Sequence, residues 1–235
     1  MRARRKPLLL EPGAPYEFPD PEPYDDEGLL AVGGDLSPER LLRAYEQGIF
    51  PWYDEGLPPL WWSPNPRAIL APEQLHVSRS LRRALRSGRF RWTANRAFSE
   101  VIRECGRERD TGTWILPEMV QAYEALHRLG HAHSFEVWSG ERLVGGLYGV
   151  QRGSLFAAES MFHRETDASK VALVKAAAWL FAHGIVLFDV QFLTAHLASL
   201  GATEISRSEY LSRARLAAAS ACCLLFAEFA GVREG

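Results

Sequence analysis

Several features that assign a chain to a specialised class are missing from this sequence of 235 residues. No hydrophobic run approaches the roughly 18 residues of a membrane-spanning helix. Only three cysteines occur, Cys105, Cys222 and Cys223, and none of them belongs to a C-x-x-C pair. An odd number of cysteines with one adjacent pair indicates reduced thiols rather than a disulfide framework.

The motifs of nucleotide and metal chemistry are missing as well. The sequence contains no G-x-x-x-x-G-K-[ST] or G-x-G-x-x-G loop for phosphates and no H-E-x-x-H motif for zinc. No serine has the context of a nucleophile elbow, so a covalent hydrolase is not supported. The basic residues 1–6 precede an apolar stretch that is too short for a signal peptide. These absences predict a cytoplasmic protein that uses no cofactor, metal or membrane.

Lysine is also scarce, with 3 lysines against 24 arginines, and the net charge is only −2. The charge is unevenly distributed, because residues 61–110 carry 11 basic and 5 acidic residues. Arginine binds phosphate through two parallel hydrogen bonds and stacks on bases, so an arginine cluster suits RNA. Arg79, Arg82, Arg83 and Arg86 are three and four residues apart, which places them largely on one face of an expected helix. The alternative is a solvated helix face without a partner.

Helical and extended patterns are mixed along the chain and predict an α+β (α/β mixed) fold. Ser37-Pro38-Glu39 is typical of a helix start, and Gly48 is typical of a helix end. The other expected helices cover residues 78–87, 117–130 and 168–183, a stretch from after Asn95 to Cys105, and the tail from Ser208. The expected strands cover residues 133–138, 142–150, 154–161 and 185–193. We expect residues 11–35 to be irregular, and residues 49–53 and 60–64 to be loops or short extended pieces.

Two of the expected strands carry charged groups among apolar residues. Within 185–193, alternation places Asp189 and Gln191 on one face, roughly 7 Å apart. An aspartate in a buried strand is unfavourable unless it is paired or functional. Asp189 is therefore either a structural carboxylate bonded to neighbouring backbone, or it faces a cleft with Gln191, where the two orient and deprotonate an amine. Glu159 is the single charge of residues 154–161, and the alternatives are a buried salt bridge and a functional role.

Many motifs, in order, resemble those of the leucyl/phenylalanyl-tRNA–protein transferases, from about Phe18 to Leu211. The matching segments are residues 18–21 (FPDP), 28–37 (GLLAVGGDLS), 48–53 (GIFPWY), 61–67 (WWSPNPR), 78–82 (SRSLR), 113–115 (TWI), 132–134 (AHS), 143–149 (LVGGLYG), 159–162 (ESMF), 168–173 (ASKVAL), 189–191 (DVQ) and 196–202 (HLASLGA). Three positions depart from the family pattern. Ala158 replaces glycine, His163 replaces serine, and Phe188 replaces isoleucine or leucine.

The resemblance implies a bacterial cytoplasmic enzyme with two domains. A small N-terminal domain, residues 1–64, is expected to lie on a larger domain, residues 65–235, with a fold like that of the acetyltransferases (GNAT), a mixed sheet flanked by helices. The implied reaction moves Leu, Phe or Met from aminoacyl-tRNA to the α-amine of proteins that begin with Arg or Lys, and so marks them for degradation by the N-end rule. An aminoacyl ester is already activated, so this reaction needs neither ATP nor a metal.

The resemblance also implies a set of site residues. Asp189 and Gln191 are expected to orient the amine and to help remove its proton, and we expect Glu159 to recognise the cationic acceptor side chain or to assist the chemistry. The terminal adenosine needs an aromatic face, for which Trp52 and Trp114 are the candidates, with core packing as the alternative for each. The remaining residues implied in substrate binding are Phe156, Ser160, Met161 and Leu173, with Phe188 as a weaker candidate because alternation places it opposite Asp189.

Two other classes of protein are weighed against this interpretation. An acyl-CoA N-acetyltransferase needs a glycine-rich loop for pyrophosphate at the start of a helix, and residues 161–170 contain no glycine. An RNA-binding module without enzymatic activity explains the arginine cluster, but it does not explain Asp189 and Glu159 in apolar strands. The aminoacyl-tRNA–protein transferase is therefore the preferred hypothesis.

Overall fold

The computed structural model describes residues 5–11, 13, 15–107, 113–222 and 224. Its main element is a seven-stranded sheet with the strand order β11-β5-β10-β9-β8-β7-β6. Strands β9 and β10 are parallel neighbours, and the other neighbouring strands of this sheet are antiparallel. The strands are β5 (Arg67–Leu70), β6 (Arg91–Ala94), β7 (Ala132–Ser139), β8 (Arg142–Arg152), β9 (Leu155–His163), β10 (Leu187–Gln191) and β11 (Thr203–Ile205).

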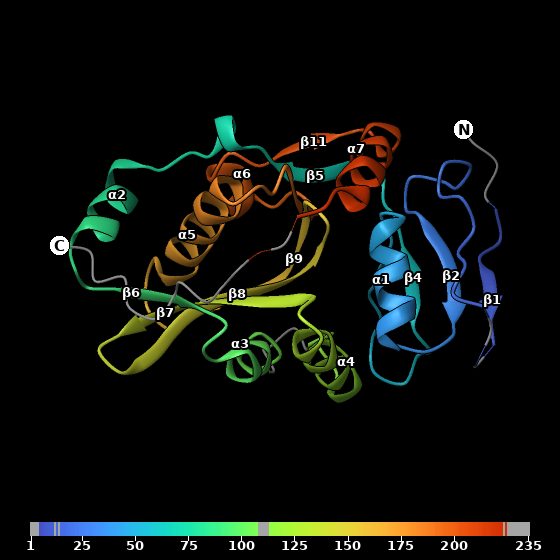
Figure 1. Cartoon of the computed structure of the whole chain (residues 1–235), viewed down its shortest axis with the longest axis horizontal. Coiled ribbons are helices and arrows are strands. Elements are labelled where there is room, and N and C mark those ends of the chain that lie inside the picture. Colours follow the sequence, from blue (N-terminus) through green and yellow to red (C-terminus); the bar gives the residue numbers. More distant parts are fainter. Residues whose placement is uncertain (1–4, 12, 14, 108–112, 223, 225–235) are drawn as a thin grey trace.

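Helices cover both faces of this sheet (Figure 1). On one face lies α5 (Ala168–Ala182), which contacts α2 (Arg79–Arg86) and the short 3₁₀ helix η1 (Pro72–Gln74). On the other face lie α3 (Phe98–Cys105) and α4 (Pro117–Arg128). Helix α5 is apolar on most of its circumference, because it is buried between the sheet and its neighbours.

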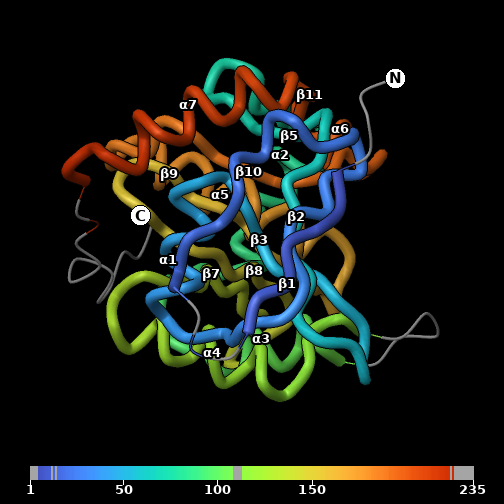
Figure 2. The backbone as a smooth tube through the Cα atoms, turned by 90° about the vertical axis from the view of Figure 1, so that its right-hand side faces the viewer, coloured from blue at the N-terminus to red at the C-terminus, as the bar shows by residue number. Residues whose placement is uncertain are grey.

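A smaller, four-stranded sheet is built from residues 8–62 and has the strand order β1-β2-β4-β3. Its strands are β1 (Leu8–Leu10), β2 (Leu29–Gly33), β3 (Phe50–Pro51) and β4 (Leu60–Trp62). Helix α1 (Pro38–Glu46) lies between this sheet and the rest of the molecule (Figure 1). It contacts α4, which lies below it in Figure 2, and α7 (Arg207–Ala219), which lies above it. Tyr45 and Trp61 share one hydrophobic core with Met119 and Tyr123 of α4, so the smaller sheet is not separate from the larger one. The division into domains at residue 64 stays a prediction.

The structure confirms most of the expected elements and corrects two. Helix α1 begins after Ser37 and Gly48 follows it with φ 71°, as the local sequence predicts. The expectation that all of residues 11–35 are irregular is wrong, because Leu29–Gly33 forms β2 between β1 and β4. The expected strand 185–193 is too long, since β10 covers only Leu187–Gln191 and Val186 is 69% exposed. In the part of the chain that the structure describes, no helix is both long and apolar enough to cross a membrane.

The strands β9 and β10 separate at the point where the polar residues lie. Their parallel pairing ends at Asp189 and Ala157, whereas β9 continues to His163. At the same level the register of β10 against β5 shifts between Asp189 and Gln191, and Gln191 has φ 59°. The register of β8 against β9 shifts at Glu159 as well. A bulge redirects a side chain out of the regular alternation, so both Gln191 and Glu159 are placed by irregular backbone.

Candidate active site

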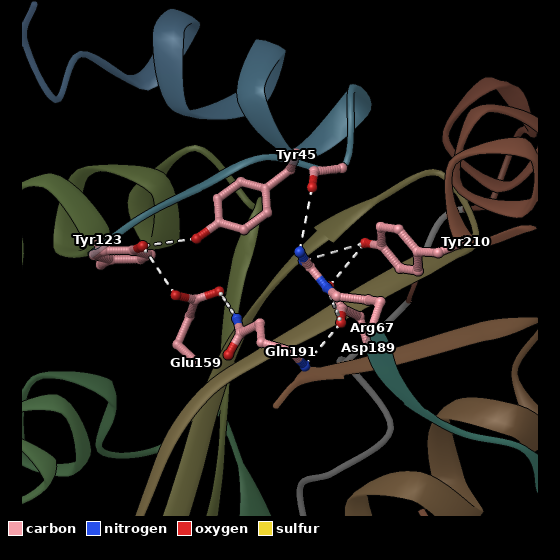
Figure 3. A network of polar contacts seen from close by, with 8 residues as sticks. Tyr45, Arg67, Tyr123, Glu159, Asp189, Gln191 and Tyr210 are labelled. Atoms are coloured by element: carbon pink, nitrogen blue, oxygen red, sulfur yellow. Dashed lines mark hydrogen bonds and ion pairs between the residues drawn. The ribbon is translucent and has the colours of Figure 1, made fainter. Parts of the chain in front are cut away.

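Asp189 is the most strongly held side chain of the site (Figure 3). Its carboxylate accepts two hydrogen bonds from Arg67, at 2.9 Å from Nε and 2.6 Å from Nη2. The hydroxyl of Tyr210 donates to it at 2.8 Å, and the backbone N–H of Gln191 donates at 2.9 Å. Asp189 and Arg67 are both fully buried, at 0% and 1% exposure. A buried charge is tolerated when it is paired and hydrogen-bonded, and Asp189 meets both conditions.

Gln191 joins Asp189 to a second buried carboxyl group. Its amide nitrogen Nε2 donates to Oε1 of Glu159 at 3.1 Å, and the hydroxyl of Tyr123 donates to the other oxygen, Oε2, at 3.1 Å. The hydroxyl of Tyr45 lies 2.7 Å from that of Tyr123. A continuous chain of hydrogen bonds therefore runs from α1 and α4, through the diverging ends of β9 and β10, to Arg67 on β5 (Figure 3). We call this chain of contacts the polar network.

Glu159 differs from Asp189 in its electrostatics. Burial raises the pKa of its carboxyl group to about 7, although the hydrogen bond from Tyr123 lowers this pKa. The negative charge of Asp189 raises this pKa further, and Arg67 lowers it. The carboxyl group thus exchanges its proton near neutral pH, in the range where an α-amino group with a pKa of about 7.7–8.0 also titrates.

A cavity of about 1110 Å³ is lined by Ser160, the residue that follows Glu159 of the polar network. Trp52, Trp114 and Ser160 all line it, so the structure brings together three of the residues that the sequence suggested for substrate binding. The Trp52 ring is 42% exposed and lies 5.7 Å from that of Phe192, the residue after Gln191. Ser160, in turn, directly follows Glu159. Consecutive residues of β9, Glu159 and Ser160, therefore connect the polar network with the cavity.

The other suggested substrate residues lie away from this cavity. Phe156 and Leu173 are fully buried in the core between the sheet and α5, where the ring of Phe156 contacts that of Phe188 at 5.3 Å. Met161 is partly buried against the same core and lines a different cavity. Neither Phe156 nor Leu173 is among the residues that line the larger cavity.

The arginines of α2 form a separate surface. Arg79, Arg82, Arg83 and Arg86 are exposed and together line one hollow of about 400 Å³, so they lie on one side of the helix as expected. Leu81 is the residue of α2 that is buried. Among the described residues no carboxylate pairs with any of the four, whereas other exposed arginines such as Arg103, Arg142 and Arg213 each have a carboxylate partner.

Sequence reasoning missed the partners of the two carboxyl groups. Arg67 ends the motif of residues 61–67 and opens the short strand β5, which no periodicity indicated. A charged residue before Ala68-Ile69-Leu70 was the available signal. The tyrosines Tyr45, Tyr123 and Tyr210 carried no signal of their own, since a tyrosine on an amphipathic helix is an ordinary core residue.

Comparison with known proteins assigns the chain to a class of enzymes, the aminoacyltransferases. Two family models match the chain: "Leucyl/phenylalanyl-tRNA protein transferase" over residues 69–215, and its "N-terminal domain" over residues 34–65. The leucyl/phenylalanyl-tRNA–protein transferase of Anaeromyxobacter sp. (strain Fw109-5) is 60% identical over 199 residues, which are 83% of this chain and 85% of the relative. The transferase of Citrobacter koseri is 56% identical over 196 residues, which are 83% of this chain and 84% of the relative. The chain belongs to the leucyl/phenylalanyl-tRNA–protein transferase family.

Solved structures give a weaker likeness. The structure of L-PGS from Bacillus licheniformis covers 72% of this chain and 57% of its own, with 14% identity and a TM-score of 0.37. A protein of unknown function from Bacteroides thetaiotaomicron also has a TM-score of 0.37, with 12% identity. The match covers 68% of this chain and 57% of the other. The mixed α+β fold is confirmed by the sheets and helices themselves, and the more specific likeness to the GNAT fold stays a prediction.

Proposed function

We propose that the enzyme transfers Leu, Phe or Met from aminoacyl-tRNA to the α-amine of proteins with an N-terminal Arg or Lys, in the cytoplasm, and marks them for N-end-rule degradation. The observation that carries this proposal is the position of the polar network, which joins Asp189, Gln191 and Glu159 beside a cavity with two tryptophans. A transfer site needs both features, because the cavity with its tryptophans binds the terminal adenosine and the polar network receives the amine.

The reaction forms an amide bond and breaks an ester bond. The nitrogen of the acceptor amine attacks the carbonyl carbon of the aminoacyl ester, and the bond from this carbon to the ribose oxygen breaks. The amine loses one proton, and the released ribose hydroxyl gains one, so the step balances without an oxidant, a metal or ATP. Alignment of amine and ester is the main task that remains for the protein.

Gln191 is the residue that contacts the amine in this proposal. All four hydrogen bonds to Asp189 come from the protein itself, so its carboxylate is saturated and acts by fixing the backbone of Gln191. The amide oxygen of Gln191, by contrast, accepts no hydrogen bond from any described residue, while its amide nitrogen is held by Glu159. This free oxygen suits an N–H of the attacking amine.

Glu159 serves as the group that holds the proton between the amine and the ribose oxygen. Its pKa of about 7 is close to that of an α-amine, so proton transfer in either direction is nearly balanced. The same carboxyl group, when ionised, favours an acceptor that begins with a cation. Tyr123 and Gln191 keep Glu159 in place through one oxygen each.

The donor has three points of attachment in this proposal. Trp52 and Trp114 stack on the terminal adenosine, and Ser160 lies between this base and the polar network. The aminoacyl side chain enters the apolar side of β9 toward Phe156 and Leu173. Those two are fully buried and Met161 packs against the same core, so the buried side of Met161 forms a wall of this pocket, and its flexible side chain is suited to adjusting to the aminoacyl group. The unpaired arginines of α2 bind phosphates farther along the tRNA.

A transfer assay tests this function. The purified protein is mixed with Phe-tRNA and a peptide that begins with Arg, without ATP, CoA or added metal, and the N-terminally extended peptide is measured by mass spectrometry. We expect extension of this peptide and none of a matched peptide that begins with Asp. Extension of both peptides alike would contradict the acceptor specificity, and extension of neither would contradict the proposed function.

A further inference from the structure

A second cavity, of about 660 Å³, lies next to the first and has a different chemistry. Arg107 lines both cavities, and the consecutive residues Ser160 and Met161 of β9 line one each. The second cavity therefore begins where the first one ends. Its remaining lining residues are mostly basic or polar: His163, Arg164, Ser169 and His196, together with Glu104 and Phe162.

Among the described residues that line this cavity, positive charge exceeds negative charge. Both guanidinium groups rely on the same carboxylate. Nε and Nη2 of Arg164 each donate to one oxygen of Glu104, the first at 2.9 Å, and Nη1 of Arg107 lies 3.6 Å from that carboxylate. Two arginines thus share one negative charge, and each keeps N–H groups for a further anion. Both arginine side chains are well exposed, at 69% for Arg107 and 45% for Arg164.

The histidines add donors to the same space. Nε2 of His196 is buried and has no hydrogen-bond partner among the described residues. His163 is exposed, and its Nδ1 lies 3.5 Å from the hydroxyl of Ser169 in the first turn of α5. Burial lowers the pKa of His196, and the neighbouring Lys170 and His163 lower it further. The donors of this cavity therefore converge from β9, from α5 and from α6 (Ala195–Ser199).

We propose that this cavity binds the phosphodiester that links the terminal adenosine of the donor tRNA to the nucleotide before it. The proposal rests on the proposed function and adds a subsite to it. A terminal nucleoside in the first cavity continues through its 5′ oxygen into this phosphate, so the phosphate lies in the adjoining space. Arg164 and Arg107 supply the charge, and His163, which stands where the family pattern has serine, supplies an additional donor.

The chemistry favours the tRNA over the acceptor protein as the occupant. The acceptor begins with a cationic residue, which two guanidinium groups repel, whereas a phosphodiester carries a negative charge at every pH of interest. Arginine holds such a group through bidentate hydrogen bonds. An acidic segment farther along an acceptor is the competing occupant, and the experiment separates the two.

Two short donors provide the test, 3′-phenylalanyl-adenosine without a phosphate and 3′-phenylalanyl-CpA with one phosphodiester. We expect kcat/KM to be about tenfold higher for the CpA donor, the value of one charge-assisted contact. His163→Ser/Arg164→Gln should abolish this preference and leave kcat/KM for the adenosine donor unchanged. Arg142→Gln is the matched control, since Arg142 is 75% exposed, pairs with Glu165 and lines neither cavity, and it should keep the preference.

The outcomes distinguish this proposal from its competitors. An unchanged preference in the double variant would overturn it, and so would an effect of that variant that appears only with acceptor peptides containing acidic residues. Calorimetry with CpA and adenosine that carry no amino acid measures the same increment without catalysis, so an inactive enzyme would refute the proposed function but still test this subsite. If inorganic phosphate binds but the affinity for CpA is no higher than that for adenosine, the cavity is a site for free anions and the proposal is overturned.

Discussion

Arg67 and Asp189 are separated by 122 residues in the chain and form a fully buried ion pair with two parallel hydrogen bonds. The guanidinium group is further enclosed by aromatic rings, at 4.6 Å from the centre of Phe50 and 4.5 Å from that of Tyr210. It also donates to the carbonyl oxygen of Gly48 at 3.3 Å, next to the end of α1. This one side chain therefore connects the smaller sheet, β10 and α7 to the position of Gln191.

Removing one partner of this pair should strongly destabilise the fold. We expect Arg67→Met to lower the free energy of unfolding by about 3–5 kcal/mol, because it leaves the carboxylate of Asp189 buried and unpaired. The double variant Arg67→Met/Asp189→Leu should be less destabilised than the sum of the single variants, as measured by urea unfolding. Arg213→Met, which breaks an exposed pair with Glu209, should change stability by less than about 1 kcal/mol. Strict additivity of the two buried substitutions would contradict the coupling.

Gln191→Gly should separate activity from stability. Gln191 has φ 59°, a conformation that glycine adopts without strain, so this substitution relieves backbone strain of about 1 kcal/mol and removes one hydrogen bond of similar value. We expect the free energy of unfolding to stay within about 1 kcal/mol, and kcat to fall by roughly 100-fold or more. Asp167→Gly, at φ 71° before α5, is the control for the backbone effect and should keep its kcat. A Gln191→Gly enzyme with the turnover of the parent would remove Gln191 from the chemical step.

The raised pKa of Glu159 predicts a specific dependence of stability on pH. Its folded-state pKa of about 7 lies above the ordinary value of 4.5, so between these values the folded protein binds more protons than the unfolded chain. The stability that Glu159 contributes is therefore fully present below pH 4.5 and is lost as the pH rises to 7. With about 1.4 kcal/mol for each unit, the loss is on the order of 3 kcal/mol.

Comparison with Glu159→Gln isolates this contribution from all other titrating groups. The difference in unfolding free energy between parent and variant should fall steadily over this pH range and then level off above pH 7. The pH profile of kcat should show an inflection near 7 that is absent in the variant. A stability difference that is independent of pH would show that Glu159 has an ordinary pKa.

Trp52→Ala should weaken the binding of the donor while preserving the fold, because this ring is 42% exposed and lines the larger cavity. Loss of one base–aromatic stack is worth about 1–3 kcal/mol, so KM for an aminoacyl-adenosine should rise by roughly 5- to 160-fold. Trp52→Phe keeps an aromatic face and should recover most of this loss. Equal KM values for the parent and the alanine variant would place the adenosine elsewhere.

The arginines of α2 should act on tRNA but not on short donors. We expect replacement of Arg79, Arg82, Arg83 and Arg86 by alanine to weaken the binding of Leu-, Phe- and Met-tRNA equally, since binding to phosphates carries no sequence information. The slope of log affinity against log salt should become shallower by about 0.7–0.9 for each phosphate that the variant no longer binds. Transfer from 3′-phenylalanyl-CpA should be nearly unchanged. A quadruple variant with the parental salt slope would identify this surface as an ordinary solvated helix face.

Elements with strong local signals are those that the sequence predicts well. Helix α1 has a serine N-cap with proline at the next position and a glycine after its end, and α3 carries apolar residues at Phe98, Val101, Ile102 and Cys105, all of which are buried. The short strands were missed because three to five residues hold too little periodicity to detect. β5 and β6 lie in the arginine-rich region, where charges obscure the pattern further.

The sequence by itself determined the family, the main helices and strands, and the presence of Asp189, Gln191 and Glu159 at places where polar groups are unfavourable. Only the tertiary structure decided which hydrogen bonds and ion pairs these groups form. Strand alternation predicts on which face of the sheet a side chain lies, but it does not predict a partner 122 residues away. The sequence therefore did not identify Arg67 as the counter-ion of Asp189. Two bulges then turn Gln191 toward Glu159, because the register of a strand depends on neighbours that local sequence does not specify.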